Sequence, residues 1–225
     1  MKKTALLTGA GGSLGGAVLR ELKQKNYHVF AAVRSQGRII ADDLCTPAIV
    51  DLSDEAQSAD FVQRGLDLLG RFDAAVLTVG GFAMAPLEET SATDIEKMIR
   101  INFYSAWHII RPLFAAMKKQ GSGRIVLIGA RPGLEPASGG AMAAYTLSKS
   151  LLITLSEILN AEGREAGIVT SVVIPSVIDT PANRRAMPDA DFTRWVSPQS
   201  LAGVISFALE SPDLREPLFK VYGDL

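Results

Sequence analysis

The stretch from Lys3 to Gly16 constrains the fold of this chain more than any other part of the sequence. A short apolar run at 3–7 predicts a buried strand, because it ends abruptly at a glycine-rich turn. Apolar residues then recur at helical spacing after the turn. A strand, a glycine turn and a helix in this order form an anion site, since the helix N-terminus directs N–H groups at a phosphate. A plain surface turn is the alternative. The turn residues predicted to bind are Thr8, Gly9, Gly11, Gly12, Ser13, Leu14 and Gly15.

Length and composition exclude several classes of protein. The 225 residues suit one α/β domain, and the formal net charge of −1 with scattered basic residues argues against nucleic acid as a partner. The single cysteine, Cys45, cannot form an internal disulfide, and no signal pattern is found, so we expect a cytoplasmic protein. No apolar stretch is long enough to span a membrane, and no ligand cluster predicts a catalytic metal. A small-molecule partner is expected.

Strands and helices alternate along the whole chain, which predicts a single Rossmann-type domain over 1–225. Its sheet would be parallel and doubly wound, with helices on both faces and ligands beyond the carboxyl ends of the strands. We expect Pro112 to kink the long helix 93–117, and the aperiodic segment 176–197 to be an irregular substrate loop. The other expected strands are 28–33, 48–50, 72–77, 124–128, 169–174 and 218–221, and the other helices 55–69, 142–163 and 198–209.

The residues that follow the second and third strands bear on the cofactor. In dinucleotide-binding sheets an acidic residue after the second strand bonds the ribose 2′-hydroxyl, whereas an arginine suits a 2′-phosphate. This chain has Arg34 there, with Arg38 close behind, which favours NADP(H) over NAD(H); a solvated arginine is the alternative. Asp51 and Leu52 would border the cofactor, and Asp51 either meets the adenine or caps the next helix.

Tyr145 and Lys149 form the predicted chemical centre. They lie four residues apart on an expected helix and therefore share a face. A nearby ammonium favours the phenolate, so we predict that the pKa of Tyr145 falls from about 10 toward neutrality. Such a tyrosine can serve as a general acid or base. The pair follows the loop after the fifth strand, where the nicotinamide end of a cofactor is expected.

Taken together, these residues resemble the short-chain dehydrogenase/reductase family over essentially the whole chain. The resemblance implies a sheet of about seven strands, hydride transfer from C4 of a nicotinamide, and a homodimer or homotetramer formed through helices 93–117 and 142–163. It implies that Tyr145 donates the proton, that Lys149 holds the nicotinamide ribose and lowers the tyrosine pKa, and that Asn102 supports a water linked to that lysine. Further cofactor contacts implied by the resemblance are Gly80, Gly81, Pro175, Val177 and Thr180, the last at the carboxamide.

The sequence departs from the family pattern in three places. Ser13 replaces the middle glycine of the turn, a small change that still permits binding. Residues 77–79 lie where the family usually has two asparagines and an alanine. The support that those residues give to the sheet in the family is therefore altered in this chain. Most importantly, Ala130 occupies the position of the catalytic serine that orients a ketone oxygen. Ser138 in the following loop is the candidate replacement.

One branch of the family, the dihydropteridine reductases, also lacks that serine. Residues 178–195 are similar to that branch almost throughout, and an aromatic residue, Phe82, follows paired glycines as it does there. A quinonoid dihydropterin is a flat ring that needs an aromatic slot and a proton donor more than a ketone clamp. Phe82, Phe192 and Trp195 are the expected slot, with packing of the loop as the alternative for the last two. Arg34 and Asn102 are not features of that branch.

We therefore expect an NADPH-dependent oxidoreductase that transfers hydride to a small acceptor, either dihydropterin-like or another conjugated compound. Its expected substrate contacts are Phe82, Ala130, Phe192 and Trp195. Two alternatives stay open. One is an ordinary carbonyl or alcohol dehydrogenase, and the other is an NADP-binding regulator that catalyses no reaction.

Overall fold

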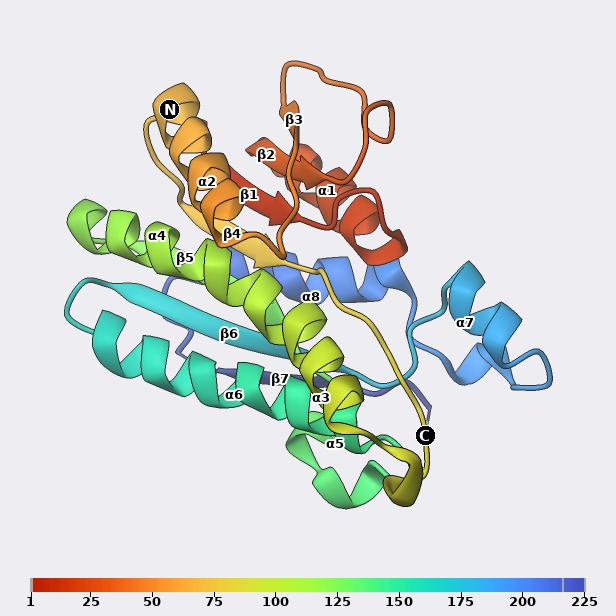
Figure 1. Ribbon diagram of the computed structural model, residues 1–225. Helices are drawn as coiled ribbons and strands as arrows, with labels where there is room; N and C mark the ends of the chain where they lie inside the picture. The colour runs from red at the N-terminus through yellow and green to blue at the C-terminus, as the bar shows by residue number, and fades with distance from the viewer. Residues whose placement is uncertain (1, 216, 225) are drawn as a thin grey trace.

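The computed structural model, which describes residues 2–215 and 217–224, contains one seven-stranded parallel sheet in the order β3-β2-β1-β4-β5-β6-β7 (Figure 1). Every neighbouring pair of strands is parallel. The central strands are continuously apolar because helices cover both faces. The strands are β1 (Thr4–Thr8), β2 (His28–Val33), β3 (Cys45–Ile49), β4 (Ala74–Leu77), β5 (Gly123–Ile128), β6 (Ile168–Pro175) and β7 (Leu218–Val221).

The strand order reverses between β1 and β4. Strands β1 to β3 run outward to one side, and β4 to β7 run outward to the other. In a doubly wound sheet this reversal leaves a crevice at the carboxyl ends of the strands, where ligands bind. The predicted α/β class and the doubly wound sheet are therefore confirmed.

Two hydrophobic clusters fill the space between the sheet and the helices. One, centred on residues such as Phe61, Leu113 and Leu152, lies under α2, α4 and α6. The other, with Val18 and Ile205, lies under α1 and α8 on the opposite face. None of the helices in the described ranges is long and apolar enough to cross a membrane. The bounds are α1 (Ser13–Gln24), α2 (Glu55–Leu69), α4 (Ser105–Gln120), α6 (Ala143–Gly163) and α8 (Pro198–Glu210).

The helix expected over 93–117 differs from the prediction. It consists of α3 (Ala92–Ile99), a π-helical turn η2 (Arg100–Tyr104) and α4, which continues through Pro112. The helix is therefore not broken at Pro112, where the kink stays a prediction, and the irregular turn lies around Asn102. That side chain is fully buried and hydrogen-bonds to Gly81 and Ser148, so contacts with distant residues accompany the π-turn.

The two long loops contain more structure than predicted. After β5 come α5 (Arg131–Leu134) and η3 (Pro136–Ser138). The substrate loop, residues 176–197, contains α7 (Pro181–Ala186), for which Thr180 is the N-cap, and η4 (Phe192–Arg194). In Figure 1 the α7 region projects from the edge of the molecule. A further turn, η1 (Leu87–Glu89), follows β4; β3 begins earlier, and β4 later, than expected.

Candidate active site

A cleft of about 890 Å³ opens at the carboxyl ends of β1 to β4. This volume lies within the range of small-molecule and cofactor sites. Seven of the predicted cofactor residues line it, namely Gly9, Gly11, Gly12, Arg34, Asp51, Leu52 and Gly80. Seven predicted positions thus share one cleft, and their role in cofactor binding stays a prediction; other lining residues, discussed below, were not predicted.

The glycine turn brings the backbone of β1 against the start of α1. Gly9 has a φ of +70°, and the N–H of Gly12 donates to its carbonyl at 2.9 Å. A Cβ atom at Gly15 would lie 2.0 Å from the Gly9 carbonyl oxygen, so only glycine permits this approach. Gly12 is the N-cap of α1, and the helix N-terminus thus faces the cleft. Leu14 is buried in the core beneath the turn.

Thr8 does not face the cleft but joins β1 to β4. Its hydroxyl accepts from the backbone N–H of Thr78 at 3.1 Å, and the Thr78 hydroxyl donates to the Thr8 carbonyl at 2.7 Å. This reciprocal pair supports the sheet at the position where the sequence departs from the family pattern. A Cβ atom at Gly9 would lie 2.5 Å from the Thr78 hydroxyl oxygen, so the turn packs directly on this pair.

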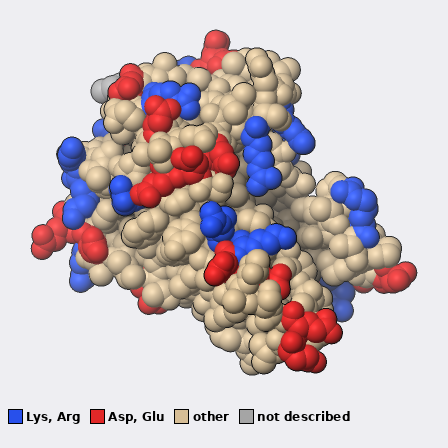
Figure 2. All heavy atoms as spheres, viewed as in Figure 1, with Lys and Arg blue, Asp and Glu red and all other residues tan. Residues whose placement is uncertain are grey.

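The cleft is electropositive. Arg34, Arg38 and Arg100 line it, and none of them has an ion-pair partner among the residues that the structure describes. Asp51 is the one carboxylate among the lining residues. Hydrogen bonds from Ser53 hold the pKa of Asp51 below its usual range, with a smaller contribution from Arg34. Figure 2 shows Lys and Arg side chains beside the hollow between the α7 lobe and the body of the molecule.

The structure excludes one of the two roles expected for Asp51 and adds Arg100 to the residues that line the cleft. Asp51 does not cap α2: it accepts from the backbone N–H of Ser53 at 2.9 Å, and Asp54 caps the helix by accepting from Gln57. Arg100 was missed, because its position on the π-turn depends on the tertiary contacts of Asn102. Its proximity in sequence to Asn102 was the one available signal.

Lys149 of α6 lies next to Gly80, which lines the cleft. A Cβ atom at Gly80 would be 3.3 Å from the Lys149 Nζ and 2.8 Å from the Asn102 Oδ1, so Gly80 separates the cleft from both side chains. Lys149 is only 5% exposed, and its ammonium donates to the Ile128 carbonyl at 2.8 Å. Burial lowers its pKa to about 8.

Tyr145 lies one helical turn before Lys149 on α6. Its ring packs edge-on against Phe82, with centroids 5.0 Å apart and an interplanar angle of 72°. Burial raises the pKa of Tyr145 to about 12, so the predicted fall toward neutrality is wrong for this structure. The physical reason is that desolvation of the phenol dominates, while the Lys149 ammonium is directed at Ile128.

Asn102 is held by three hydrogen bonds. Its Oδ1 accepts from the Gly81 N–H at 2.8 Å, and its Nδ2 donates to the Gly81 carbonyl at 3.1 Å and the Ser148 hydroxyl at 2.9 Å. Its side chain thus fixes the segment after β4 against α6. The water contact implied by the family resemblance stays a prediction.

Ala130 occupies the position at which the family has its catalytic serine. This residue is 5% exposed and immediately precedes α5. The candidate replacement, Ser138, is exposed, and its hydroxyl donates to the Glu135 carbonyl at 2.8 Å. Ser138 would have to leave this bond to contact a substrate.

The remaining predicted residues lie on β6 and the substrate loop. Pro175 ends β6, and the Val177 carbonyl accepts from Val196 at 2.9 Å. Phe192 packs on Trp195 at 4.8 Å between ring centroids. Within the described residues these two rings make no ring contact with Phe82 or Tyr145, so the structure brings only Phe82 to the tyrosine.

The fold and the site define a doubly wound α/β protein with a glycine-lined cleft and a tyrosine–lysine pair on the neighbouring helix α6. The family model described as short chain dehydrogenase matches residues 3–191, and the chain accordingly belongs to the short-chain dehydrogenase/reductase family of oxidoreductases.

Known proteins of similar sequence and structure agree with this assignment. The chain is 30% identical over 216 residues to the uncharacterized oxidoreductase YxjF of Bacillus subtilis, covering 92% of this chain and 83% of YxjF. It is 25% identical over 213 residues to a D-beta-hydroxybutyrate dehydrogenase of Rhizobium meliloti, covering 89% and 81%. Among solved structures, ElxO with NADP bound superposes with a TM-score of 0.89 at 22% identity, covering 99% and 98% of the two chains, which shows the shared fold.

Proposed function

We propose that this chain binds NADP(H) in the cleft and reduces a small conjugated acceptor, with a quinonoid dihydropterin as the leading candidate. The observation that carries the proposal is the junction at Gly80, where the glycine-lined cleft reaches Lys149 and Asn102. The related oxidoreductases and the NADP-bound ElxO structure support the choice of cofactor class.

The residues of the cleft suit a phosphorylated dinucleotide. Gly9, Gly11 and Gly12 lack the side chains that would fill the turn, so a pyrophosphate can approach the N-terminus of α1. Arg34 and Arg38 would hold the 2′-phosphate, since both line the cleft and neither forms a salt bridge within the described part of the chain. The remaining proposed contacts are Ser13, Leu14 and Gly15 at the turn, Asp51 and Leu52 at the adenine, and Gly80, Gly81, Pro175, Val177 and Thr180 toward the nicotinamide.

The bound cofactor would supply the hydride. Tyr145 would supply the proton: with a pKa of about 12 its phenol stays protonated at neutral pH, as a proton donor requires. Lys149, whose pKa is about 8, is mostly charged at pH 7 and would stabilise the phenolate left after the transfer. Asn102 would keep the segment after β4 in place through Gly81.

The acceptor is inferred from what surrounds Tyr145. Ala130 provides no hydroxyl to orient a ketone oxygen, which favours an acceptor protonated on a conjugated ring system. Phe82 is 60% exposed and stands on the Tyr145 ring, so a flat ring could pack against it. Phe192 and Trp195 would complete the slot when the substrate loop approaches.

The outer faces of α4 and α6 support the proposed homodimer or homotetramer. Leu147 and Ile158 are each about half exposed on α6, and Tyr104 is 45% exposed beside α4. Phe103, whose ring contacts Tyr104, stacks on Trp107 at 6.1 Å between ring centroids. A second copy would cover these apolar groups, and light scattering of the purified protein measures the oligomeric state.

The experiment is an acceptor panel of ketones and quinonoid dihydropterin, with NADPH consumption followed for the wild type, Tyr145→Phe and Tyr104→Phe as the matched control. We expect turnover of the dihydropterin, and a loss of about 10²-fold or more in Tyr145→Phe with NADPH binding retained. Turnover of ketones alone would favour an ordinary carbonyl reductase. Binding of NADPH without any turnover would favour a regulator.

Cofactor preference is tested separately. Arg34→Asp should weaken NADPH binding by about tenfold or more, which corresponds to about 1.4 kcal/mol, and leave NADH binding nearly unchanged. Arg164→Asp, an exposed arginine that does not line the cleft, is the matched control. Equal weakening of both cofactors by Arg34→Asp would contradict the assignment.

A further inference from the structure

Three side chains converge on the Glu135 carboxylate just after α5. Its Oε2 accepts from the Arg131 Nε at 2.9 Å, and its Oε1 accepts from the Lys220 Nζ at 3.3 Å and the Tyr222 hydroxyl at 3.2 Å. The Arg131 guanidinium also lies over the Tyr222 ring, 5.2 Å from its centroid. Glu135 thus ties the segment after β5 to the segment after β7.

The same segment, residues 222–224, also contacts the substrate loop. The Ser176 hydroxyl donates to the Tyr222 carbonyl, and the Arg194 Nε donates to the Asp224 carbonyl at 2.7 Å. Gly223 has a φ of +66°, and a Cβ atom there would lie 2.5 Å from the Arg194 carbonyl oxygen. The loop therefore rests directly on the 222–224 segment.

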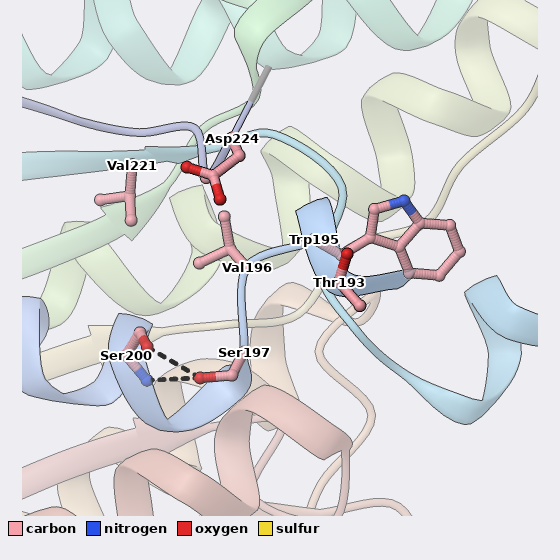
Figure 3. Close-up of a pocket in the computed structure, with 8 residues that line it drawn as sticks. Thr193, Trp195, Val196, Ser197, Ser200, Val221 and Asp224 are labelled. Atoms are coloured by element: carbon pink, nitrogen blue, oxygen red, sulfur yellow. Dashed lines mark hydrogen bonds between the residues drawn. The ribbon is translucent and has the colours of Figure 1, made fainter. Parts of the chain in front are cut away.

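Figure 3 shows the far end of this segment. Asp224 and Val221 border a small cavity of about 300 Å³, and Thr193 and Ser197 of the substrate loop border it as well. The Trp195 indole points away from Asp224. The loop contacts the segment through the side chains of Ser176 and Arg194 and through the Arg194 carbonyl oxygen, which lies close to Gly223.

The other end of the connection reaches the catalytic helix. Helix α5 lies on α6 so closely that a Cβ atom at Gly133 would be 2.8 Å from the Lys149 Cβ. Ala130, at the start of α5, borders the proposed substrate site. A displacement of Glu135 would therefore move both the wall beside Lys149 and the support of the substrate loop.

We propose that the 222–224 segment is a brace that sets the position of the substrate loop relative to Tyr145 and Lys149, with Glu135 as its anchor. Glu135 is then a positioning residue: it acts through Tyr222 and α5 and touches neither cofactor nor substrate. Its kinetic part depends on the proposed function. The brace itself also limits how often the substrate loop opens, and this property can be measured without knowing the substrate.

The test compares Glu135→Gln and Tyr222→Phe with the wild type. Glu135→Gln removes the charge and keeps the shape, and Tyr222→Phe removes one hydrogen bond. The matched control is Asp60→Asn, which breaks a similar Arg–carboxylate pair four residues apart on α2, between Asp60 and Arg64 at 2.8 Å. Circular dichroism and thermal unfolding confirm that each variant folds.

The first readout is limited proteolysis by trypsin after Arg184 and Arg185, which are exposed in the substrate loop. We expect several-fold faster cleavage at these sites in both brace variants, and wild-type cleavage in Asp60→Asn. Cleavage at the wild-type rate in both variants would overturn the brace. This readout needs no substrate, so it stands even if the proposed function fails.

The second readout is steady-state kinetics with whichever acceptor the panel identifies. We expect a several-fold higher KM for the acceptor, a kcat within about twofold of wild type and unchanged NADPH binding. A purely structural role would lower kcat and cofactor binding together. Faster cleavage with an unchanged KM would refute the role of Glu135 in positioning the loop for the reaction.

Discussion

Replacing Lys149 by Met should make the protein more stable at neutral pH while removing its activity. The lysine is 5% exposed, and its ammonium has the Ile128 carbonyl as its hydrogen-bond acceptor within the described residues. Burial lowers the pKa of Lys149 from 10.5 to about 8, which corresponds to about 3 kcal/mol of unfavourable free energy for keeping the charge in the folded state. Loss of the hydrogen bond costs about 1.5–3 kcal/mol and offsets part of this gain. We therefore expect the free energy of unfolding to rise by about 1 kcal/mol at pH 7.

The dependence on pH distinguishes this explanation from simple packing. Between pH 8 and 10.5 the unfolded chain binds the proton of Lys149 more strongly than the folded chain does, so wild-type stability rises with pH across this window. At pH 9.5 the wild type should have gained about 2 kcal/mol relative to pH 7, and Lys149→Met should not share this gain. The order of stability therefore reverses between the two pH values.

Urea unfolding of both proteins at pH 7 and pH 9.5 measures the effect. Lys119→Met, at an exposed position near the end of α4, is the matched control and should follow the wild type at both pH values. A stability difference between wild type and Lys149→Met that is the same at both pH values would refute the reasoning. Such a result would mean that burial does not penalise the ammonium.

Three further predictions concern the turn, the backbone and the missing serine. Gly15→Ala should lose about 1–3 kcal/mol of stability in urea unfolding and bind NADPH poorly, because its Cβ would meet the Gly9 carbonyl oxygen at 2.0 Å. In Gly16→Ala the new Cβ would have no neighbour closer than 3.6 Å, so stability and NADPH binding should stay near the wild type. Equal losses in the two variants would contradict the steric argument. Ala141→Gly should raise the free energy of unfolding by about 0.5–1 kcal/mol, since this residue has a φ of 56°; a decrease would show that the left-handed backbone is not strained. Ala130→Ser should add turnover of ketones in the acceptor panel without changing NADPH affinity, and no gain would mean that the lost hydroxyl does not limit the substrate range.

Local signals in the sequence were sufficient for much of the fold. The strand 28–33 and the helix 55–69 were predicted with the bounds that the structure shows. Each has a local cause: a continuous apolar run in the strand, and an N-cap residue, Asp54, with an apolar face in the helix. The glycine turn was predictable for the same reason, because the steric demand at Gly15 arises from the nearby Gly9 backbone.

The features that could not be predicted depend on contacts between distant residues. The π-turn at 100–104 accompanies the burial of Asn102 against Gly81 and Ser148, and no local signal in the sequence indicated it. The spacing of Tyr145 and Lys149 correctly placed both on one helix, but spacing carries no information about solvent exposure. The pKa of Tyr145 was therefore predicted to move in the wrong direction.

This error bears on the direction of the proposed chemistry. Burial shifts both groups toward their neutral forms: the pKa of Tyr145 rises to about 12 and that of Lys149 falls to about 8. A phenol that stays protonated is prepared to give a proton, whereas removal of a proton from an alcohol would require a phenolate. Ala130 bears on the kind of acceptor and not on the direction, since it leaves no hydroxyl to hold either a ketone or an alcohol oxygen next to the tyrosine. The raised pKa of Tyr145 thus favours its proposed role as a proton donor, and the missing hydroxyl favours an acceptor other than a simple ketone.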